Sequence, residues 1–249
     1  MATQDLWQSI SPSVPATTGR DTSLTRHRQP ARDTAPAPTG LLLAHAESLS
    51  ATGSILKRSI DLVFSGVTLL LIAPILAVIA LAIRLDSPGP VFYVAERIGR
   101  NGRGFRCFKF RTMVRDAERR QKEMLHLNER DGVLFKIAHD PRVTRVGSLL
   151  RKYSLDELPQ FFNVLRGEMS VVGPRPPVAS EVREYTRNHM RRLAVLPGIT
   201  GLWQTQGRHD PSFESYVSLD LAYIEHWSVG LDLKIILQTV GIVLAGTGI

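Results

Sequence analysis

An apolar run in the first half of the chain constrains the fold more than any other feature. Residues 62–83 read LVFSGVTLLLIAPILAVIALAI and contain no charged side chain. At about 1.5 Å per residue, a straight helix of this length reaches roughly 33 Å, enough to cross a bilayer core. A buried core helix is the alternative, but a run that is apolar on every face is typical of a membrane helix. We therefore predict a membrane helix here.

Pro74 lies near the middle of this run and bears on whether the helix spans the bilayer. Proline removes one backbone donor and clashes with the preceding turn, so a kink is expected. Cations flank the run on both sides: Lys57, Arg58, Arg84, Arg97, Arg100 and Arg103. Such flanks oppose translocation of either end. We predict a re-entrant helix-break-helix over residues 54–86, with a kinked spanning helix as the alternative.

The segment before the membrane helix has a different composition. Residues 1–53 carry many Pro, Ser, Thr, Ala and Arg residues and hold no sustained helical or strand period. Such composition is typical of a disordered tail. Its short apolar run at 41–44 is too brief and too far from the start for a signal peptide.

The charge balance limits the class of partner. The net charge is +8 over 249 residues, which fits nucleic acid, an anionic membrane or a phosphorylated substrate. Nucleic acid is the weakest of these, because the chain shows no recognition motif and its basic residues follow a membrane segment. The single cysteine, Cys107, excludes an intrachain disulfide and a cysteine-rich zinc site, and we interpret it as a packing residue.

The remainder, residues 87–249, predicts a mostly helical α+β domain with a small β-hairpin. The hairpin pairs residues 91–94 with 105–110 around Asn101-Gly102. Helices are expected at 115–130, at 146–152, from Ser154 to a stop at Gly167, at 178–193, at 213–227 and at 231–245. Residues 140–142 are expected to form a loop, 171–172 a strand, and 196–208 a turn-rich loop. We predict that the amphipathic helices of this domain lie at the membrane interface.

Two adjacent carboxylates, Asp156 and Glu157, are the candidate catalytic pair. Acidic residues also favour the first turn of a helix, and Ser154 with Glu157 matches a capping box. Lys109 and Arg111 lie in FKFRTM, on a strand that can face the same cleft as the carboxylates. Arg151 lies one turn earlier, and Arg175 is held between two prolines. Cations on rigid supports beside carboxylates suggest a site for phosphate oxygens, although such residues also form solvated or membrane-surface faces.

Five motifs in order resemble one family. SPGPVFY, FKFRTM, SLDELPQFFNVLRGEMSVVGPRP, LPGITGLWQTQGR and LDLKI are similar to those of the bacterial sugar transferases, the monotopic phosphoglycosyl transferases, here in a short form. The resemblance runs from about Lys57 to the C-terminus. One departure is Ala73 before Pro74, where some members have serine.

The resemblance implies transfer of a sugar 1-phosphate from a UDP-sugar to undecaprenyl phosphate, with release of UMP, at the start of exopolysaccharide or glycan assembly. Asp156 matches the nucleophile of a covalent aspartyl-phosphosugar intermediate and a ligand of Mg²⁺, and Glu157 matches its partner. The family's binding or catalytic positions include Lys109, Arg151, Arg175, Asp232 and Arg208, and we add Arg111 from its neighbourhood. It also implies that residues 87–249 are a cytoplasmic catalytic domain at the bacterial inner membrane, and it leaves a homodimer open.

A membrane-surface scaffold that assembles other glycan enzymes is the competing hypothesis. Release of UMP from a nucleotide sugar distinguishes the two. The sequence does not name the sugar, and glucose, galactose and modified hexoses remain open.

Overall fold

The computed structural model describes residues 51–124, 137, 140–207 and 212–246. The predicted tail lies outside these residues except for its last three, which belong to the first described helix. Arg208, a predicted binding residue, also lies outside them. The described part is α+β, as predicted: helices surround a two-stranded antiparallel sheet and a two-stranded parallel one.

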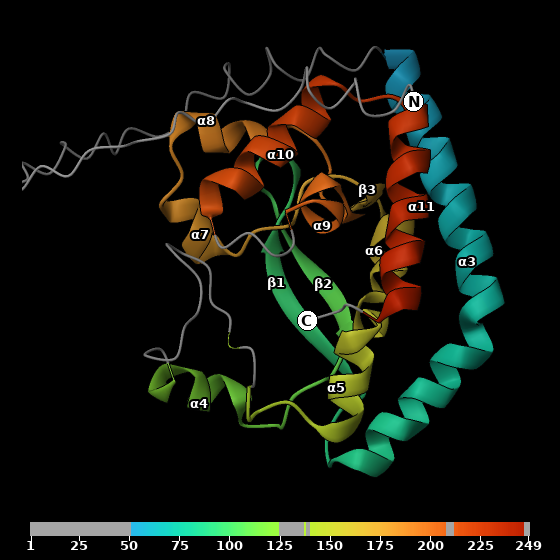
Figure 1. The fold of residues 1–249 in the computed structure, drawn as a ribbon, viewed down its shortest axis with the longest axis vertical. Coiled ribbons are helices and arrows are strands. Elements are labelled where there is room, and N and C mark those ends of the chain that lie inside the picture. The colour runs from blue at the N-terminus through green and yellow to red at the C-terminus, as the bar shows by residue number, and fades with distance from the viewer. Residues whose placement is uncertain (1–50, 125–136, 138–139, 208–211, 247–249) are drawn as a thin grey trace, which may run out of the picture. The chain divides into compact units, whose positions relative to one another are not determined.

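The apolar run lies in one long helix, α3 (Ala51–Asp86), which contains Pro74. Among the described residues it is the one helix long and apolar enough to cross a membrane. Many of its large apolar side chains are exposed, Leu70 by 77%. Figure 1 shows that α3 changes direction part-way along, which agrees with the kink expected from a proline within a helix.

The predicted hairpin is present and longer than expected. Strand β1 (Phe92–Ile98) pairs antiparallel with β2 (Gly104–Phe110), in a register that sets Tyr93 opposite Lys109 and Ala95 opposite Cys107. The turn between them, η2 (Arg100–Gly102), has positive φ angles of 59° at Asn101 and 74° at Gly102. Asparagine and glycine tolerate this backbone region best, which is why this dipeptide marks the turn. Cys107 is fully buried, as its packing role requires.

A second sheet differs from expectation. Strand β3 (Ser170–Val172) was predicted, but its parallel partner β4 (Gly198–Thr200) and helix α9 (Leu202–Thr205) occupy a segment predicted as a loop. Both elements are too short to set up a periodic pattern. A Cβ at Gly198 would lie 2.1 Å from the Gly173 nitrogen, so glycine is needed there for the two backbones to meet.

Most predicted helices are confirmed. They are α4 (Ala117–Glu123), which begins the helix expected at 115–130, then α5 (Arg145–Lys152), α6 (Gln160–Arg166), α10 (Phe213–Glu225) and α11 (Val229–Ala245). Gly167 ends α6 with a left-handed φ of 81°, as expected of a helix stop. Residues 125–130 of the predicted polar helix lie outside the described residues.

The prediction of one amphipathic helix over residues 178–193 is wrong. The segment divides into α7 (Ala179–Arg183), α8 (Arg187–Met190) and the 3-10 turn η5 (Arg191–Ala194). Thr186 interrupts it because its hydroxyl accepts the His189 N–H and begins a new helix. Arg192 points inward to a buried ion pair with Asp220 instead of covering a polar face.

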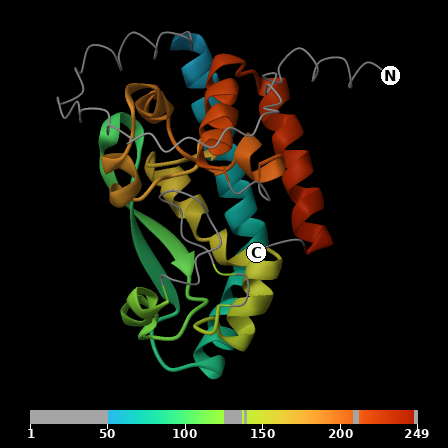
Figure 2. The same cartoon turned by 60° about the vertical axis from the view of Figure 1, so that its left-hand side comes forward.

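Helix α3 packs against the rest of this domain along much of its length. Near its C-terminal end, Ile79 and Ile83 join Phe110 and Leu150 in a buried apolar cluster. Nearer its N-terminal end it lies beside α11, and residues of both helices line a small pocket (Figures 1 and 2). The hairpin, α5 and α6 are therefore fixed relative to the apolar helix.

Candidate active site

A tight turn between α5 and α6 presents Asp156 and Glu157. Ser154 follows α5 with a positive φ of 52°, and the 3-10 turn η4 (Leu155–Glu157) comes next. The predicted capping box is wrong, because the Ser154 side chain makes no capping bond and α6 begins only at Gln160. A non-glycine residue in the left-handed region is uncommon, and strained backbone of this kind clusters at functional sites.

Glu157 pairs with a lysine from the hairpin rather than with its own helix. The Lys109 Nζ lies 2.7 Å from Glu157 Oε1, and the two side chains are only 23% and 24% exposed. Lys109 comes from β2, so this ion pair joins the sheet to the η4 turn. The prediction that Lys109 faces the carboxylates is confirmed.

Arg151 reaches the same turn from α5. Its Nε donates to Thr112 Oγ1 at 3.0 Å, and its charge acts on Asp156. The close approach of α5 to Thr112 requires Gly147, because a Cβ there would lie 2.1 Å from the Thr112 carbonyl oxygen. The structure thus brings together Lys109, Arg151, Asp156 and Glu157.

The carboxyl of Asp156 has an unusual titration. Its pKa is raised to about 6, because the effect of burial and of the neighbouring Glu157 charge outweighs that of Lys109 and Arg151, which lower the pKa. Asp156 does not lie in the first turn of α6, which begins four residues later, and burial has the largest effect on its pKa. A carboxylate with a raised pKa beside two cations is typical of a functional site.

Arg111 does not join this cluster. Its guanidinium donates to the carbonyls of Pro88 at 2.6 Å and Ser87 at 2.7 Å, just beyond the end of α3. Gly89 permits this contact, since its φ is +134° and a Cβ there would lie 2.3 Å from Arg111 Nη1. The prediction that Arg111 faces the carboxylates is therefore wrong: the side chain is 7% exposed and satisfies backbone carbonyls at a helix end.

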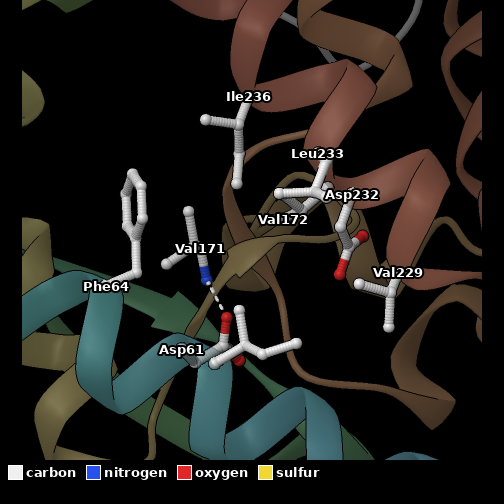
Figure 3. Close-up of a pocket in the computed structure, with 9 residues that line it drawn as sticks. Asp61, Phe64, Val171, Val172, Val229, Asp232, Leu233 and Ile236 are labelled. Atoms are coloured by element: carbon white, nitrogen blue, oxygen red, sulfur yellow. Dashed lines mark hydrogen bonds between the residues drawn. The ribbon is translucent and has the colours of Figure 1, made fainter.

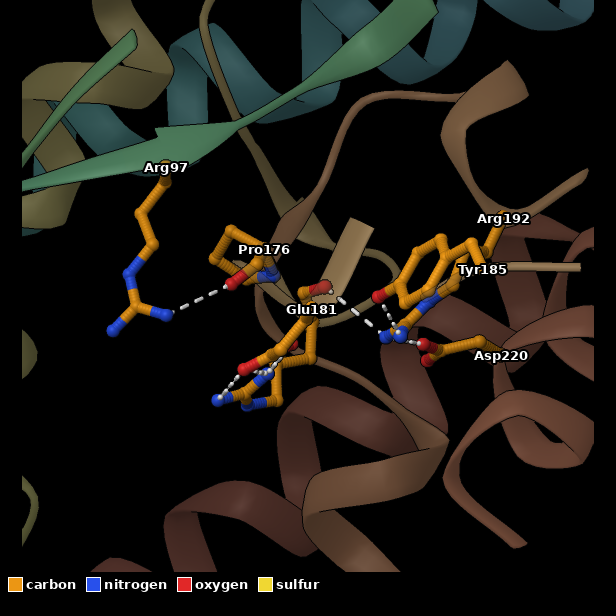
Figure 4. A network of polar contacts seen from close by, with 7 residues as sticks. Arg97, Pro176, Glu181, Tyr185, Arg192 and Asp220 are labelled. Carbon is orange, nitrogen blue, oxygen red and sulfur yellow. Dashed lines mark hydrogen bonds and ion pairs between the residues drawn. The ribbon is translucent and has the colours of Figure 1, made fainter. Parts of the chain in front are cut away.

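Arg175 lies in a separate network of charged groups. Figure 4 shows its members Glu181, Tyr185, Arg192 and Asp220. Its partner is Glu181, with Nη1 to Oε2 at 2.9 Å, rather than Asp156 or Glu157. The Arg175 carbonyl accepts from Arg192, which also contacts Tyr185 and forms the buried pair with Asp220. The sequence signals Arg175 by its two flanking prolines, but gives no sign of Arg192 and Asp220.

Asp232 also lies apart from Asp156, in the pocket between α3 and α11 (Figure 3). Its carboxylate accepts from Lys57 at 2.7 Å, from the Tyr223 hydroxyl at 2.8 Å and from the Trp227 indole at 3.2 Å. Asp61 lines the same pocket and accepts the Val171 N–H at 3.0 Å. Asp61 was not predicted, although its spacing of four residues from Lys57 placed the two on one helix face.

We expect Asp232→Asn to destabilise the protein. Lys57 and Asp232 are only 14% and 11% exposed, and removing one partner of a buried ion pair costs about 3–5 kcal/mol. Thermal unfolding in detergent measures the change. The control is Asp116→Asn. Asp116 pairs with the exposed Arg120, so this substitution should leave the melting temperature nearly unchanged. Equal melting temperatures for the Asp232 variant and the wild type would contradict a tie between α3 and α11.

Comparison with known proteins identifies the family. A model of the bacterial sugar transferases matches residues 52–246. The exopolysaccharide production protein ExoY of Rhizobium meliloti is 43% identical over 200 residues, which cover 79% of this chain and 88% of ExoY. The chain belongs to the bacterial sugar transferase family. The resemblance in the sequence motifs is confirmed.

Two longer relatives in this family have more specific names. The galactosyl transferase CpsE of Streptococcus agalactiae is 47% identical over 195 residues, 78% of this chain and 43% of CpsE. The UDP-glucose:undecaprenyl-phosphate glucose-1-phosphate transferase of Escherichia coli is 43% identical over 201 residues, 77% of this chain and 41% of that enzyme. The chain therefore matches less than half the length of these two sugar transferases.

Proposed function

We propose that this sugar transferase moves a sugar 1-phosphate from a UDP-sugar to undecaprenyl phosphate, as the names of its relatives suggest. The observation that carries the proposal is the cluster of Asp156, Glu157, Lys109 and Arg151 at one turn. A half-buried carboxylate between two cations suits attack on a densely anionic diphosphate.

Asp156 is the nucleophile in this proposal. One of its carboxylate oxygens bonds to the β-phosphorus, and the bond from that phosphorus to the bridging oxygen breaks, so UMP leaves with the electron pair. An oxygen of undecaprenyl phosphate then attacks the same phosphorus and restores the carboxylate. The covalent intermediate divides one hard transfer into two, so the soluble donor and the lipid acceptor need not bind together.

Lys109 and Arg151 bind and orient phosphate oxygens, and Glu157 positions Lys109 through their ion pair. In the described ranges, with their gaps, no three His, Cys, Asp or Glu side chains are placed to cage a metal ion. Mg²⁺ fits nevertheless, because it is commonly held by one or two carboxylates together with substrate phosphates. Asp156 would hold the ion, which would neutralise diphosphate charge when bound.

The proposed membrane arrangement is a re-entrant α3 on the cytoplasmic face of the inner membrane. Its N-terminal part is tied to the domain by Lys57 to Asp232 and by Asp61 to the Val171 N–H. Its C-terminal end is held by Arg111, and Asp86 accepts the Val146 N–H at 3.1 Å. Because both ends contact one folded domain, a helix that bends and returns fits better than one that spans. A homodimer stays a prediction.

The decisive experiment is a donor screen with the purified chain in detergent. UDP-glucose, UDP-galactose and N-acetylated UDP-hexoses are each incubated with undecaprenyl phosphate and Mg²⁺, and UMP release is measured. We expect release with at least one donor, and loss of release in EDTA. Failure with all donors, in protein that is folded by thermal melting, would favour the scaffold hypothesis.

Activity should fall as the pH drops through the pKa of Asp156. Only the ionised carboxylate attacks phosphorus, so kcat/KM should fall by about tenfold per pH unit below about pH 6. Lys109→Met removes a charge that lowers this pKa, so the acid limb should move to higher pH. The pH-rate profiles of the two proteins are compared, with melting temperature followed over the same range. An acid limb at the same pH in both proteins would contradict the assignment.

A further inference from the structure

Arg97 joins the hairpin to the loop that carries Arg175. Its Nη1 donates to the Pro176 carbonyl at 3.3 Å, and the next residue, Ile98, donates its N–H to the Pro177 carbonyl at 2.9 Å. Figure 4 shows the Arg97 side chain extending from β1 toward Pro176. The end of β1 is therefore held to the segment after Arg175 by one side-chain and one backbone N–H donor, and a backbone carbonyl accepts each bond.

The two arginines form a positively charged site. Glu181 is 3% exposed and pairs with Arg175, so it compensates one of the two guanidinium charges. Burial and the nearby charge of Arg175 both lower the pKa of Arg97. The Arg97 Nε is buried and has no hydrogen-bond partner in the part of the chain that the structure describes. An anion at this position would relieve the repulsion and accept the remaining donors.

The same hairpin face carries Lys109, the lysine of the candidate site. Side chains at Tyr93, Ala95 and Arg97 share one face, because alternate residues of a strand do. The register sets Lys109 opposite Tyr93 on that face. Arg97 is four residues from Tyr93, about 13 Å along the strand. Lys109 with Asp156 thus lies toward one end of this face and Arg97 with Arg175 toward the other.

We infer that Arg97 and Arg175 form a second phosphate subsite, separate from the phosphorus that Asp156 attacks. Paired guanidinium groups bind phosphate through several parallel N–H bonds, which a lysine cannot reproduce. The inference rests on the proposed function, because that function supplies the two phosphate esters that are candidate ligands. The ligand is the phosphate of the nucleotide or that of the polyprenyl acceptor.

Binding rather than turnover tests the subsite, so its outcome is independent of the transfer reaction. The full chain in detergent is titrated with UMP and with farnesyl phosphate, and with uridine and farnesol as phosphate-free partners. We expect Arg97→Gln to weaken binding of one of the two phosphates by about tenfold or more. Binding of the matching compound without phosphate, uridine or farnesol, should stay unchanged. The phosphate that loses affinity identifies the source.

The matched control is Arg106→Gln, which removes one charge from the other face of the same hairpin. Arg106 is exposed and lies opposite Glu96, so both phosphates should bind this variant as they bind the wild type. Equal loss for the two variants, equal loss for UMP and uridine, or no binding of either phosphate by the wild type would overturn the inference.

Arg97→Lys keeps the charge and a donor for Pro176, and it serves if the Gln variant fails to fold. We expect it to bind the affected phosphate about threefold or more below the wild type, because the planar fork is lost. Wild-type affinity in this variant would mean that Arg97 only holds the loop at Pro176. The inference that Arg97 and Arg175 together bind a phosphate would then be wrong. Binding that follows this pattern in a protein that releases no UMP would support the subsite and refute the transfer reaction.

Discussion

Asp156→Asn is expected to lower turnover by about a thousandfold or more, because an amide is a poor nucleophile at phosphorus. Incubation with a donor labelled in its sugar, without acceptor, should label the wild-type protein and leave the variant unlabelled. The proposed intermediate is an acyl phosphate, so hydroxylamine should release the label. Normal labelling of the Asn variant would remove Asp156 from the nucleophile role.

The same change should not destabilise the fold. The native environment raises the pKa of Asp156 to about 6, so ionisation above that pH is less favourable in the folded state than in the unfolded state. Removing the charge should therefore keep or raise the melting temperature at neutral pH, and the difference should shrink as the pH falls below 6. Loss of turnover together with a marked fall in melting temperature would indicate a structural role instead.

Elements with a strong local signal could be predicted from the sequence. The apolar run predicts α3, Asn101-Gly102 predicts the hairpin turn, and Gly167 predicts the end of α6, because each depends on backbone preferences or on burial of one continuous segment. The pairing of β3 with β4 could not be predicted, because it depends on two three-residue strands that are far apart in the chain.

Side-chain partners were harder to predict than elements. The Ser154 and Glu157 pattern fits a capping box, but Glu157 pairs with Lys109 from a distant strand instead. Lys109 and Arg111 were both expected to face the carboxylates from one strand, yet β2 ends at Phe110 and Arg111 contacts the end of α3. In both cases a tertiary contact decides between two local possibilities that the sequence leaves equal.

The sequence indicates which residues belong to the candidate site, but not how these residues are grouped in space. Motif order indicates Asp156, Arg175 and Asp232 equally, whereas the structure separates them into three environments. Asp156 lies with Lys109 and Arg151, Arg175 pairs with Glu181, and Asp232 holds Lys57. Such separation depends on the packing of α3, the hairpin and α11, which no single segment encodes.

Pro74→Leu is expected to move the segment before α3 to the periplasm in part of the population. Leucine restores the missing backbone donor and removes the clash, so residues 62–83 become an unbroken apolar helix of spanning length. Lipid favours a helix whose backbone groups are all paired. A straight α3 cannot keep both of its ends on one domain, so turnover should fall with the change in topology.

The N-terminal end of α3 should be the end that is released. Only two cations close to it, Lys57 and Arg58, oppose translocation, whereas Arg84, Arg97, Arg100 and Arg103 follow the other end. Its main tie to the domain is the ion pair of Lys57 with Asp232. Asp232→Asn added to Pro74→Leu should therefore increase the translocated fraction. The control is Ala73→Leu, which adds an apolar side chain at the neighbouring position and keeps the proline.

The measurement uses a single cysteine placed among residues 1–50, with Cys107→Ser, probed in whole bacterial cells with a membrane-impermeant thiol reagent. Wild-type Pro74 and Ala73→Leu should protect the cysteine, Pro74→Leu should expose part of it, and the double variant should expose more. Labelling with Pro74 in place would mean that α3 already spans the bilayer. The re-entrant arrangement of residues 54–86 would then be wrong, and the kinked spanning helix would replace it.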